Sequence, residues 1–313
     1  MPLALVTGGA GFIGSHLVRA LVARGHAVRV VDNLSTGSRD NLEGLSVELI
    51  PADIANPTTL RGAARGADVI YHLAAMISVP ASLDNPVGCY QTNVLGSLHL
   101  LEAARREGVR RVVLASSCAV YGDRQEPVDE DAEPRPQSPY AASKLAMEDL
   151  ARLYHRTLGL ATVCLRFFNV YGPRQDPASP YAAVIPRFIE AMHRGHAATI
   201  FGDGEQSRDF VFVEDVVQAL LLAAEAPAAP GGTFNIGRGQ ATTILELETT
   251  LRQLFPGAPP TIRAPERPGD IRLSQADIRR ATETLGYRPV HDLHHGLQAT
   301  VEWMRRSLPT ASA

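Results

Sequence analysis

Cysteine is scarce in this 313-residue sequence, and the three cysteines present form no recognisable pattern. Cys89, Cys118 and Cys164 are an odd number, and they lack the short spacings with which cysteines bind zinc. The sequence therefore gives no sign of a disulfide framework or of a metal site. We expect all three thiols to be reduced.

The sequence also lacks a strong charge of either sign and any long apolar run. Its formal net charge is −3 at pH 7, and its basic residues are scattered, so it offers no basic face to nucleic acid. No apolar run approaches the roughly 18 residues of a membrane-spanning helix, and the first residues show neither a basic segment nor a cleavage site. We expect a cytoplasmic protein with no nucleic-acid or membrane partner.

What the sequence does contain is a regular alternation of strand and helix patterns in its first half. Its composition, with 45% hydrophobic and 20% charged residues, is that of an ordinary globular protein. The predicted strands are 3–7, 27–31, 46–50, 68–72, 110–115 and 161–166, and the predicted helices are 12–24, 57–64, 86–107 and 140–158. This alternation predicts an α/β fold, a Rossmann-type doubly wound parallel sheet, which we place at residues 1–168.

The character of the chain changes after residue 168. Prolines at positions 173, 177, 180 and 186 interrupt it. Further elements are predicted at 187–194, 213–225, 233–236, 244–255 and 293–307. We expect a smaller, mixed α/β C-terminal domain over 169–313, packed over the open end of the sheet, with the strand near 233–237 as a candidate to rejoin the first domain.

The most informative motif joins the first predicted strand to the first predicted helix. Gly8, Gly11 and Gly14 are spaced three apart, directly after an apolar run. In a dinucleotide-binding turn the first glycine permits a tight bend, the second lets the backbone approach a pyrophosphate, and the third lets the helix pack on the sheet. The N-terminus of the helix then faces the phosphates. The motif predicts a bound dinucleotide.

Asp32 ends the next predicted strand, eighteen residues after Gly14, where this motif requires an acid. A carboxylate at that point accepts hydrogen bonds from both hydroxyls of an adenosine ribose and repels a 2′-phosphate, which favours NAD over NADP. Arg39 is the one nearby feature that argues against NAD. The alternative is a solvated aspartate in a loop.

Tyr140 and Lys144 lie one turn apart at the start of the predicted helix 140–158. A tyrosine that acts as a base near neutral pH needs its pKa lowered from about 10 by roughly two to three, which a neighbouring ammonium and a positive nicotinamide ring could supply. Such pairs also occur on ordinary amphipathic helices. Ser116 and Ser117 favour the catalytic interpretation, because they follow a strand at the sheet edge where a cofactor binds. Ser117 could hydrogen-bond the same substrate oxygen as Tyr140.

With these motifs in place, the sequence resembles the extended short-chain dehydrogenase/reductase family of NAD-dependent sugar-nucleotide enzymes, in particular its UDP-galactose 4-epimerase branch. The resemblance covers nearly the whole chain and includes Ala52-Asp53-Ile54, His72-Leu73-Ala74-Ala75 and Thr92-Asn93-Val94. In the family the first of these segments meets the adenine and the second lines the cofactor. The cofactor-binding residues that the resemblance implies are Gly8, Gly11, Phe12, Ile13, Gly14, Asp32, Asn33, Asp53, Ile54, Leu73, Ala74, Ala75, Asn93, Ser116, Tyr140 and Lys144.

Three later segments, 166–173, 208–210 and 267–270, resemble the substrate site of the family. In relatives the arginines of the last two segments clamp the diphosphate, which suits the bidentate geometry of guanidinium and phosphate. The final aspartate binds a ribose hydroxyl there, and the residue four places later lines the sugar pocket. The substrate-binding residues that the resemblance implies are Ser78, Ser117, Tyr140, Asn169 on the diphosphate side, Arg208, Arg267, Asp270 and Ser274.

The resemblance also implies a catalytic set of Ser117, Tyr140 and Lys144. Ser116 stays open as an alternative source of the hydroxyl. We favour Ser117, because relatives place the catalytic group two residues before the equivalent of Ala119, and a thiol such as that of Cys118 is a weaker donor.

The two residues after Ser117 suggest the type of reaction. Dehydratases and decarboxylases of the family need a carboxylate there, and this chain has Cys118 and Ala119. Without that acid a 4-keto sugar can only be turned and reduced from its other face, which inverts carbon 4. We expect UDP-glucose and UDP-galactose as substrates and, because Ser274 is small, their N-acetyl forms as well. Another sugar-nucleotide enzyme (UDP-glucuronate epimerase, dehydratase or reductase) and a non-catalytic NAD-binding partner protein stay open.

The two longest helices predicted in the first half carry more apolar positions than one sheet layer can cover. These positions are Leu95, Leu98, Leu101, Met147, Leu150, Leu153 and Tyr154. In the resembled family these two helices form a four-helix bundle across a two-fold axis. We therefore expect a homodimer.

Overall fold

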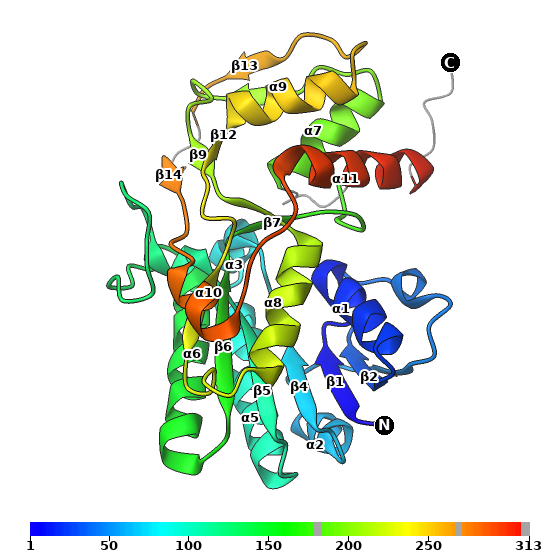
Figure 1. Cartoon of the computed structure of the whole chain (residues 1–313), viewed down its shortest axis with the longest axis vertical. Coiled ribbons are helices and arrows are strands. Elements are labelled where there is room, and N and C mark those ends of the chain that lie inside the picture. The colour runs from blue at the N-terminus through cyan, green and yellow to red at the C-terminus, as the bar shows by residue number, and fades with distance from the viewer. Residues whose placement is uncertain (178–182, 267–270, 308–313) are drawn as a thin grey trace.

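A seven-stranded parallel sheet forms the centre of the molecule, as the computed structural model shows for residues 1–177, 183–266 and 271–307 (Figure 1). The strands are β1 (Leu3–Thr7), β2 (Ala27–Asp32), β3 (Glu48–Pro51), β4 (Val69–His72), β5 (Arg111–Ser117), β6 (Thr162–Phe167) and β11 (Thr233–Ile236). Their order is β11-β6-β5-β4-β1-β2-β3. The Rossmann-type α/β fold predicted from the sequence is confirmed.

The strand order reverses between β1 and β4, because β1 pairs with β2 on one side and with β4 on the other. At such a switch point the two neighbouring loops leave in opposite directions and open a crevice at the carboxyl ends of the strands. The fold therefore places its ligand site beside Thr7 and His72, the last residues of β1 and β4.

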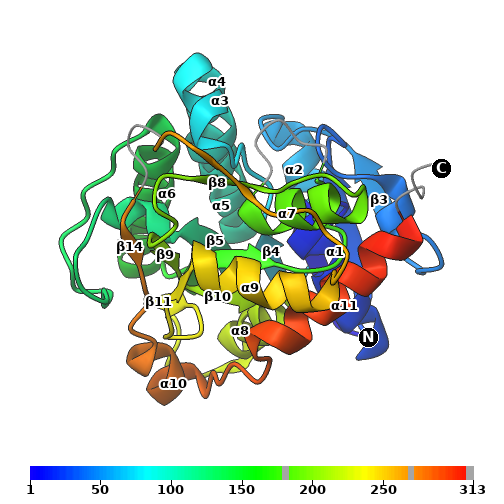
Figure 2. The same cartoon turned by 90° about the horizontal axis from the view of Figure 1, so that it is seen from above.

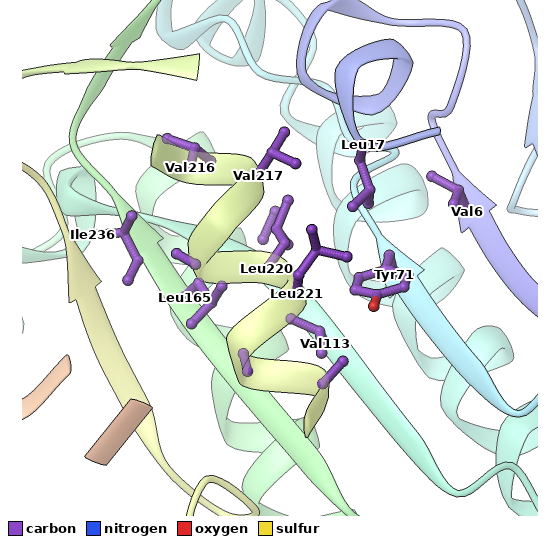
Figure 3. Close-up of a cluster of buried hydrophobic side chains, with 14 of the residues drawn as sticks. Val6, Leu17, Tyr71, Val113, Leu165, Val216, Val217, Leu220, Leu221 and Ile236 are labelled. Atoms are coloured by element: carbon purple, nitrogen blue, oxygen red, sulfur yellow. The ribbon is translucent and has the colours of Figure 1, made fainter. Parts of the chain in front are cut away.

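Helices cover both faces of the sheet, and alternate strand residues face each layer. Helices α1 (Phe12–Ala23) and α8 (Val213–Glu225) pack on one face, and Figure 3 shows Val216, Leu220 and Leu221 of α8 over the side chains of Val113 and Leu165. Helices α2 (Pro57–Ala64), α5 (Gly96–Arg106) and α6 (Pro139–Leu158) cover the opposite face. Two separate hydrophobic layers thus hold the sheet rigid.

The chain after residue 168 returns to this core. Helix α8 covers the sheet, and β11 pairs in parallel with β6, from Thr233 opposite Cys164 to Ile236 opposite Phe167. Helix α10 (Arg279–Leu285) then packs beside α8 and β11. Segments from the second half of the sequence therefore complete the sheet layer and tie it to the second lobe.

The predicted helix 86–107 is wrong as one continuous helix. A short helix, α3 (Val79–Asp84), precedes α4 (Pro86–Tyr90), and the break falls at Asn85, which caps α4 and precedes a proline. A π-helical stretch, η2 (Gln91–Leu95), joins α4 to α5. Such stretches hold one extra residue and often occur at functional sites.

A smaller lobe lies over the carboxyl end of the sheet (Figures 1 and 2). Its helices are α7 (Val184–His193), α9 (Ile244–Leu254) and α11 (Leu293–Ser307). Its short strands are β7 (Asn169–Tyr171), β8 (Thr199–Phe201), β9 (Ser207–Arg208), β10 (Phe210–Phe212), β12 (Thr242–Thr243), β13 (Ile262–Ala264) and β14 (Leu273–Ser274). They pair as β10-β7, β12-β9-β14 and β13-β8. A hydrophobic cluster that includes Phe188, Phe210 and Leu247 fills the lobe.

Two short 3₁₀ helices lie at the ligand edge of the sheet, η1 (Arg39–Leu42) after β2 and η3 (Cys118–Tyr121) after β5. Ser117 caps η3 by accepting a hydrogen bond from the amide of Ala119 at 3.2 Å. Within the described ranges, no helix combines the length and the apolar character that crossing a membrane requires.

Candidate active site

The predicted cofactor residues meet along the carboxyl edge of the sheet. The glycine turn follows β1, Asp32 ends β2, Leu73 follows β4 and Ser117 ends β5. Because these strands are parallel neighbours, their loops share one crevice. The N-terminus of α6, which carries Tyr140, closes the same edge.

The glycine turn has the geometry that a pyrophosphate site requires. Gly8 has φ +72°, and a Cβ added there would lie 2.7 Å from the amide nitrogen of Ala74. A Cβ on Gly14 would lie 2.0 Å from the carbonyl oxygen of Gly8, so the start of α1 packs directly on the turn. At Gly11 a Cβ would meet only that oxygen, at 3.3 Å. Gly8 and Gly14 are thus needed for the turn itself, whereas Gly11 leaves its side open to a ligand.

Asp32 is buried and holds the turn from below. Its carboxylate accepts hydrogen bonds from the amide of Ala10 at 2.9 Å and from the amide of Leu34 at 2.8 Å. A carboxylate has acceptor sites beyond these two, which suits the two ribose hydroxyls. Next to it, Asn33 donates to Asp53 at 3.0 Å, and both side chains are exposed at the expected adenine side.

A buried polar chain fixes the backbone after β4. Ser97 donates to the carbonyl of Asn93 at 2.5 Å, so its oxygen accepts from His72 Nε2 at 2.9 Å, and His72 Nδ1 accepts from Thr7 at 2.8 Å. Burial lowers the pKa of His72 to about 3, which keeps the ring neutral. The Thr7 hydroxyl in turn accepts from the amide of Ala74 at 3.3 Å. Leu73, Ala74 and Ala75 are thereby held against the glycine turn.

Asn93 lies in the π-helical stretch η2 and is fully buried. Its amide group accepts from the Met76 nitrogen at 2.8 Å and donates to the Met76 oxygen at 3.0 Å and to the Ser143 hydroxyl at 2.9 Å. These contacts link α6 to the segment after Ala75. The geometry favours support of the cofactor edge by Asn93.

Tyr140, Ser117 and Lys144 come together as predicted from the sequence. The Tyr140 hydroxyl is hydrogen-bonded to Ser117, and Lys144 Nζ donates to the carbonyl of Ala115 at 2.8 Å. Ser82, which the sequence did not single out, accepts a hydrogen bond from the Tyr140 amide at 3.1 Å and so anchors the start of α6. The hydroxyl, phenol and ammonium thus occupy one buried corner.

The expected lowering of the Tyr140 pKa is wrong for the protein by itself. Burial raises the pKa of Tyr140 to about 12, and the hydrogen bond from Ser117 opposes this only in part. Burial also lowers the pKa of Lys144 to about 8. Desolvation dominates because both groups are enclosed, and burial of this kind is not visible in a spacing of four residues.

Lys144 is the only lysine among the 30 basic residues of the chain. All other cations are arginine, whose planar guanidinium binds anions well and does not lose its proton in proteins. A compact ammonium that can titrate is therefore present at this one position. The count alone, read from the sequence, identifies Lys144 as a residue that arginine has not replaced.

The structure separates the roles of Ser116 and Ser117. Ser116 is buried and donates to the Glu148 carboxylate at 2.5 Å, so its hydroxyl is already used inside the protein. Ser117 is less buried and faces Tyr140. This geometry favours Ser117 as the hydroxyl that meets a substrate.

A cleft of about 370 Å³ lies between the sheet edge and the second lobe. Asn169 and Arg208 line it together with Val184, Phe201 and Gln206. The side-chain oxygen of Asn169 is buried there without a hydrogen-bond partner in the described chain, which marks an acceptor that awaits a donor. The sequence analysis missed the strand and helix residues of this cleft, because an apolar wall carries no distinctive motif.

Ser274 lies between the cleft and the catalytic corner. In the β9–β14 pair it stands opposite Arg208, and it is hydrogen-bonded to the Cys118 thiol, one residue from Ser117. The structure thus places it where a residue that lines a sugar pocket is expected. Arg267 and Asp270 lie outside the described residues.

Asp209, also missed from the sequence, fixes this wall. Its buried carboxylate accepts from the amides of Arg238 at 2.7 Å, Gly239 at 2.9 Å and Ala276 at 3.1 Å. The hydroxyl of Ser78 caps α3 by accepting from Ala81 at 3.1 Å. Among the described residues, no group of three or more His, Cys, Asp or Glu could hold a metal ion.

Comparison with known proteins finds the same fold in sugar-nucleotide enzymes. Residues 4–237 match the NAD dependent epimerase/dehydratase family. A UDP-glucose 4-epimerase of Mycolicibacterium smegmatis is 44% identical over 311 residues, covering 96% of this chain and 98% of that protein. A UDP-N-acetyl-alpha-D-glucosaminuronate decarboxylase of Bacillus cytotoxicus is 34% identical over 96% of this chain and 97% of that protein.

Solved structures agree. The UDP-glucose 4-epimerase of Thermotoga maritima, with UDP-glucose, has a TM-score of 0.94 and 40% identity, covering 98% of this chain and all of that one. A UDP-N-acetylglucosamine 4-epimerase of Methanobrevibacter ruminantium, with UDP-N-acetylmuramic acid, has a TM-score of 0.94 and 38% identity, covering 98% and 99%. The Thermus thermophilus UDP-glucose 4-epimerase, with NAD, has a TM-score of 0.89 and 38% identity, covering 98% and 100%.

The open side of Gly11 generates a first prediction. The purified protein should carry tightly bound NAD, which catalysis returns unchanged, and chromatography of the nucleotide released on denaturation should show it. Gly11→Val should fold and lose the cofactor, because the new side chain occupies the space left for the pyrophosphate. Gly62→Val is the matched control, since nothing lies within 4 Å of a Cβ there. Cofactor-free wild-type protein that consumes NADH stoichiometrically would contradict the prediction.

Proposed function

The chain belongs to the NAD dependent epimerase/dehydratase family and uses NAD, and from that premise we propose that it inverts carbon 4 of a UDP-hexose. The substrates in this proposal are UDP-glucose and UDP-galactose, and also their N-acetyl forms. One observation carries the proposal, namely the chemistry of Cys118 and Ala119, the two residues directly after Ser117.

Neither of these two residues can act as an acid. Burial raises the pKa of the Cys118 thiol to about 11, and the thiol is already hydrogen-bonded to Ser274. Ala119 has no ionisable group. Elimination or decarboxylation needs a group that donates a proton in the step after oxidation. The corner holds a proton acceptor for one alcohol but no second acid at positions 118 and 119, which suits oxidation and re-reduction at a single carbon.

In this mechanism Tyr140 accepts the proton of the 4-hydroxyl, and Ser117 hydrogen-bonds the same oxygen. Bound NAD supplies the hydride acceptor and a positive ring beside the phenol. That charge is needed, because burial alone holds the pKa of Tyr140 near 12. Lys144, anchored on the Ala115 carbonyl, adds a second positive charge to the same corner. The keto sugar then accepts hydride on its other face while Tyr140 returns the proton.

We assign the cleft to the uridine diphosphate. Arg208 and the unpartnered oxygen of Asn169 would bind the diphosphate side. Holding the nucleotide there leaves the sugar free to present either face to the catalytic corner. Uronic acids are a weaker proposal, because the resembled uronate enzymes place an additional arginine where this chain has Gln175 and Asp176. An unpaired carboxylate in the pocket would be costly.

A turnover assay tests the proposal. The purified protein is incubated separately with UDP-glucose, UDP-galactose, both N-acetyl forms and UDP-glucuronic acid, and the products are separated by anion-exchange chromatography. Interconversion of the 4-epimers without loss of carbon dioxide or water supports the proposal. Release of carbon dioxide from UDP-glucuronic acid would instead indicate a decarboxylase, and inert protein that still binds NAD would indicate a binding role.

Tyr140→Phe should lower kcat by about 10²–10⁴ while leaving the fold and NAD binding intact, because it removes only the proton acceptor. Ser117→Ala should cost less. Tyr71→Phe is the matched control, since Tyr71 is buried in the sheet core away from the carboxyl edge. Near-normal activity in Tyr140→Phe would show that another residue is the base.

Ser274→Tyr should abolish turnover of the N-acetyl substrates and spare UDP-glucose and UDP-galactose. An acetamido group needs more room than a hydroxyl, and overpacking a pocket costs about 1–3 kcal/mol. The position beside Cys118 supports this, because a larger side chain there would point at the catalytic corner. Equal loss of both activities, measured as kcat/KM, would indicate a folding defect instead.

We also propose that the protein is a homodimer. Exposed apolar residues, including Val87 at 67% and Leu95 at 43%, surround a hollow of about 520 Å³ on α4, η2 and α5. Leu101, Met147 and Tyr154 are buried in their own subunit, so this face is narrower than the sequence suggested. An uninterrupted apolar surface of this kind is typical of an interface between copies.

Sedimentation should give a dimer at micromolar concentration. Val87→Asp with Leu95→Asp should give a folded monomer, because two charges cannot be buried unpaired in that surface. Val290→Asp is the control, since Val290 is exposed on the far lobe. A wild-type monomer at micromolar concentration would contradict the proposal.

A further inference from the structure

Three residues on one face of α6 contact the end of β5. Tyr140, Lys144 and Glu148 are each one turn apart, so they form a single stripe along the helix. Tyr140 meets Ser117, Lys144 donates to the Ala115 carbonyl, and Glu148 accepts from Ser116. Three consecutive strand residues are thus matched to three successive helical turns. The mechanism proposed above uses only the first two members of the stripe.

Glu148 is the most enclosed member. It is 1% exposed, and its carboxylate accepts from Ser116 Oγ at 2.5 Å, Arg166 Nε at 2.9 Å and a terminal nitrogen of Arg166 at 2.7 Å. Arg166, on β6, is 3% exposed. A single carboxylate therefore joins α6, β5 and β6 at the catalytic end of the sheet.

Such a group is an expensive way to hold a helix. A buried ion pair often contributes no more stability than an apolar pair of the same size, because both charges lose their hydration. What the pair does provide is geometry, since two guanidinium bonds and one hydroxyl bond fix the carboxylate in one place. A helix held by apolar side chains alone could slide along the strand by a fraction of a turn.

We propose that Glu148 is a positioning residue for the reaction: it fixes the register of α6 on β5, so that Tyr140 meets Ser117, and it keeps Lys144 in its ammonium form. The inference rests on the proposed function for its activity measurements only. Its electrostatic part concerns the protein itself.

The surroundings of Lys144 support the electrostatic part. Burial lowers the pKa of Lys144 to about 8, and Glu148 acts in the opposite direction together with the thiols of Cys89 on α4 and Cys164 on β6. His72 on β4 also faces Lys144, and burial keeps that ring neutral. Those thiols are neutral near pH 7 unless deprotonated, which makes Glu148 the one anion acting on Lys144 among these groups.

Arg166 makes the effect of removing that anion larger. In the intact pair the guanidinium charge is compensated by Glu148. With an uncharged side chain at position 148, the positive charge of Arg166 would remain near Lys144 without compensation. Both changes disfavour the ammonium, so the pKa of Lys144 must fall.

The test exploits the single lysine of the chain. Protein grown with lysine labelled with ¹³C at the ε-carbon gives one side-chain NMR signal, that of Lys144, and its chemical shift is followed against pH in NAD-saturated protein. In Glu148→Gln the midpoint should fall by about 1 relative to wild type. The kcat at pH 8 should fall by about 10–100-fold, the alkaline limb of the pH profile should move the same way, and KM should stay within about twofold.

Ser116→Ala separates register from charge. It removes the bond to β5 and leaves the Glu148–Arg166 pair, so kcat should fall while Lys144 titrates as in wild type. Asp215→Asn is the matched control, because Asp215 is an equally buried carboxylate on α8 that binds the amides of Val290 and His291 away from this site. It should change neither quantity.

If Glu148→Gln fails to fold, Glu148→Asp takes its place, with an unchanged Lys144 midpoint and a lower kcat as the expected result. An unchanged midpoint in folded Glu148→Gln overturns the proposal, whether or not kcat falls, and so does a shifted midpoint in Asp215→Asn. Full activity in both Glu148→Gln and Ser116→Ala overturns the register. Wild-type protein without epimerase activity would refute the proposed function, and the NMR titration would still decide the charge.

Discussion

The packing of α6 on the end of β5 is the constraint on which the catalytic site depends. It removes Tyr140 and Lys144 from water, and that desolvation sets both of their pKa values against the roles proposed for them. The Ala115 carbonyl replaces part of the lost hydration of Lys144. A site built in this way is inert until a positive charge enters it. Burial therefore couples the basicity of the phenol to the presence of the oxidised cofactor, which protects the protein from proton transfer without hydride transfer.

The substrate side depends on a different kind of fixed group. Asp209 is a buried carboxylate that binds three backbone amides, and burial raises its pKa to about 6 in spite of them. It ties the strand that carries Arg208 to the loop after β11 and to the residues after Ser274. The two lobes are thus joined by backbone hydrogen bonds to one side chain. The sugar pocket has a wall whose position is set by the same lobe contact that closes the cleft.

Much of the fold could be predicted because long, periodic segments report their own structure. Helices 57–64 and 213–225 and strand 3–7 have the boundaries that the sequence predicts. The strands of two or three residues in the second lobe could not be predicted, since β9, β12 and β14 exist only through pairing with distant segments. At the site, the spacing of Tyr140 and Lys144 was readable, whereas burial and its effect on the pKa were not. Glu148 reads as an ordinary acid on a helix until Arg166 is seen beside it.

The π-helical stretch at 91–95 has a consequence for how this protein can change in length. One residue corresponds to a rotation of about 100° in an α-helix. Deleting a residue there would restore regular helical hydrogen bonding, but it would turn α4 by that angle relative to α5. Asn93 would leave the Met76 backbone, and the apolar residues of α4 would leave the face they share with Leu95 and Leu98. Insertions and deletions are thus excluded at this point, although substitutions on its outer surface remain permitted.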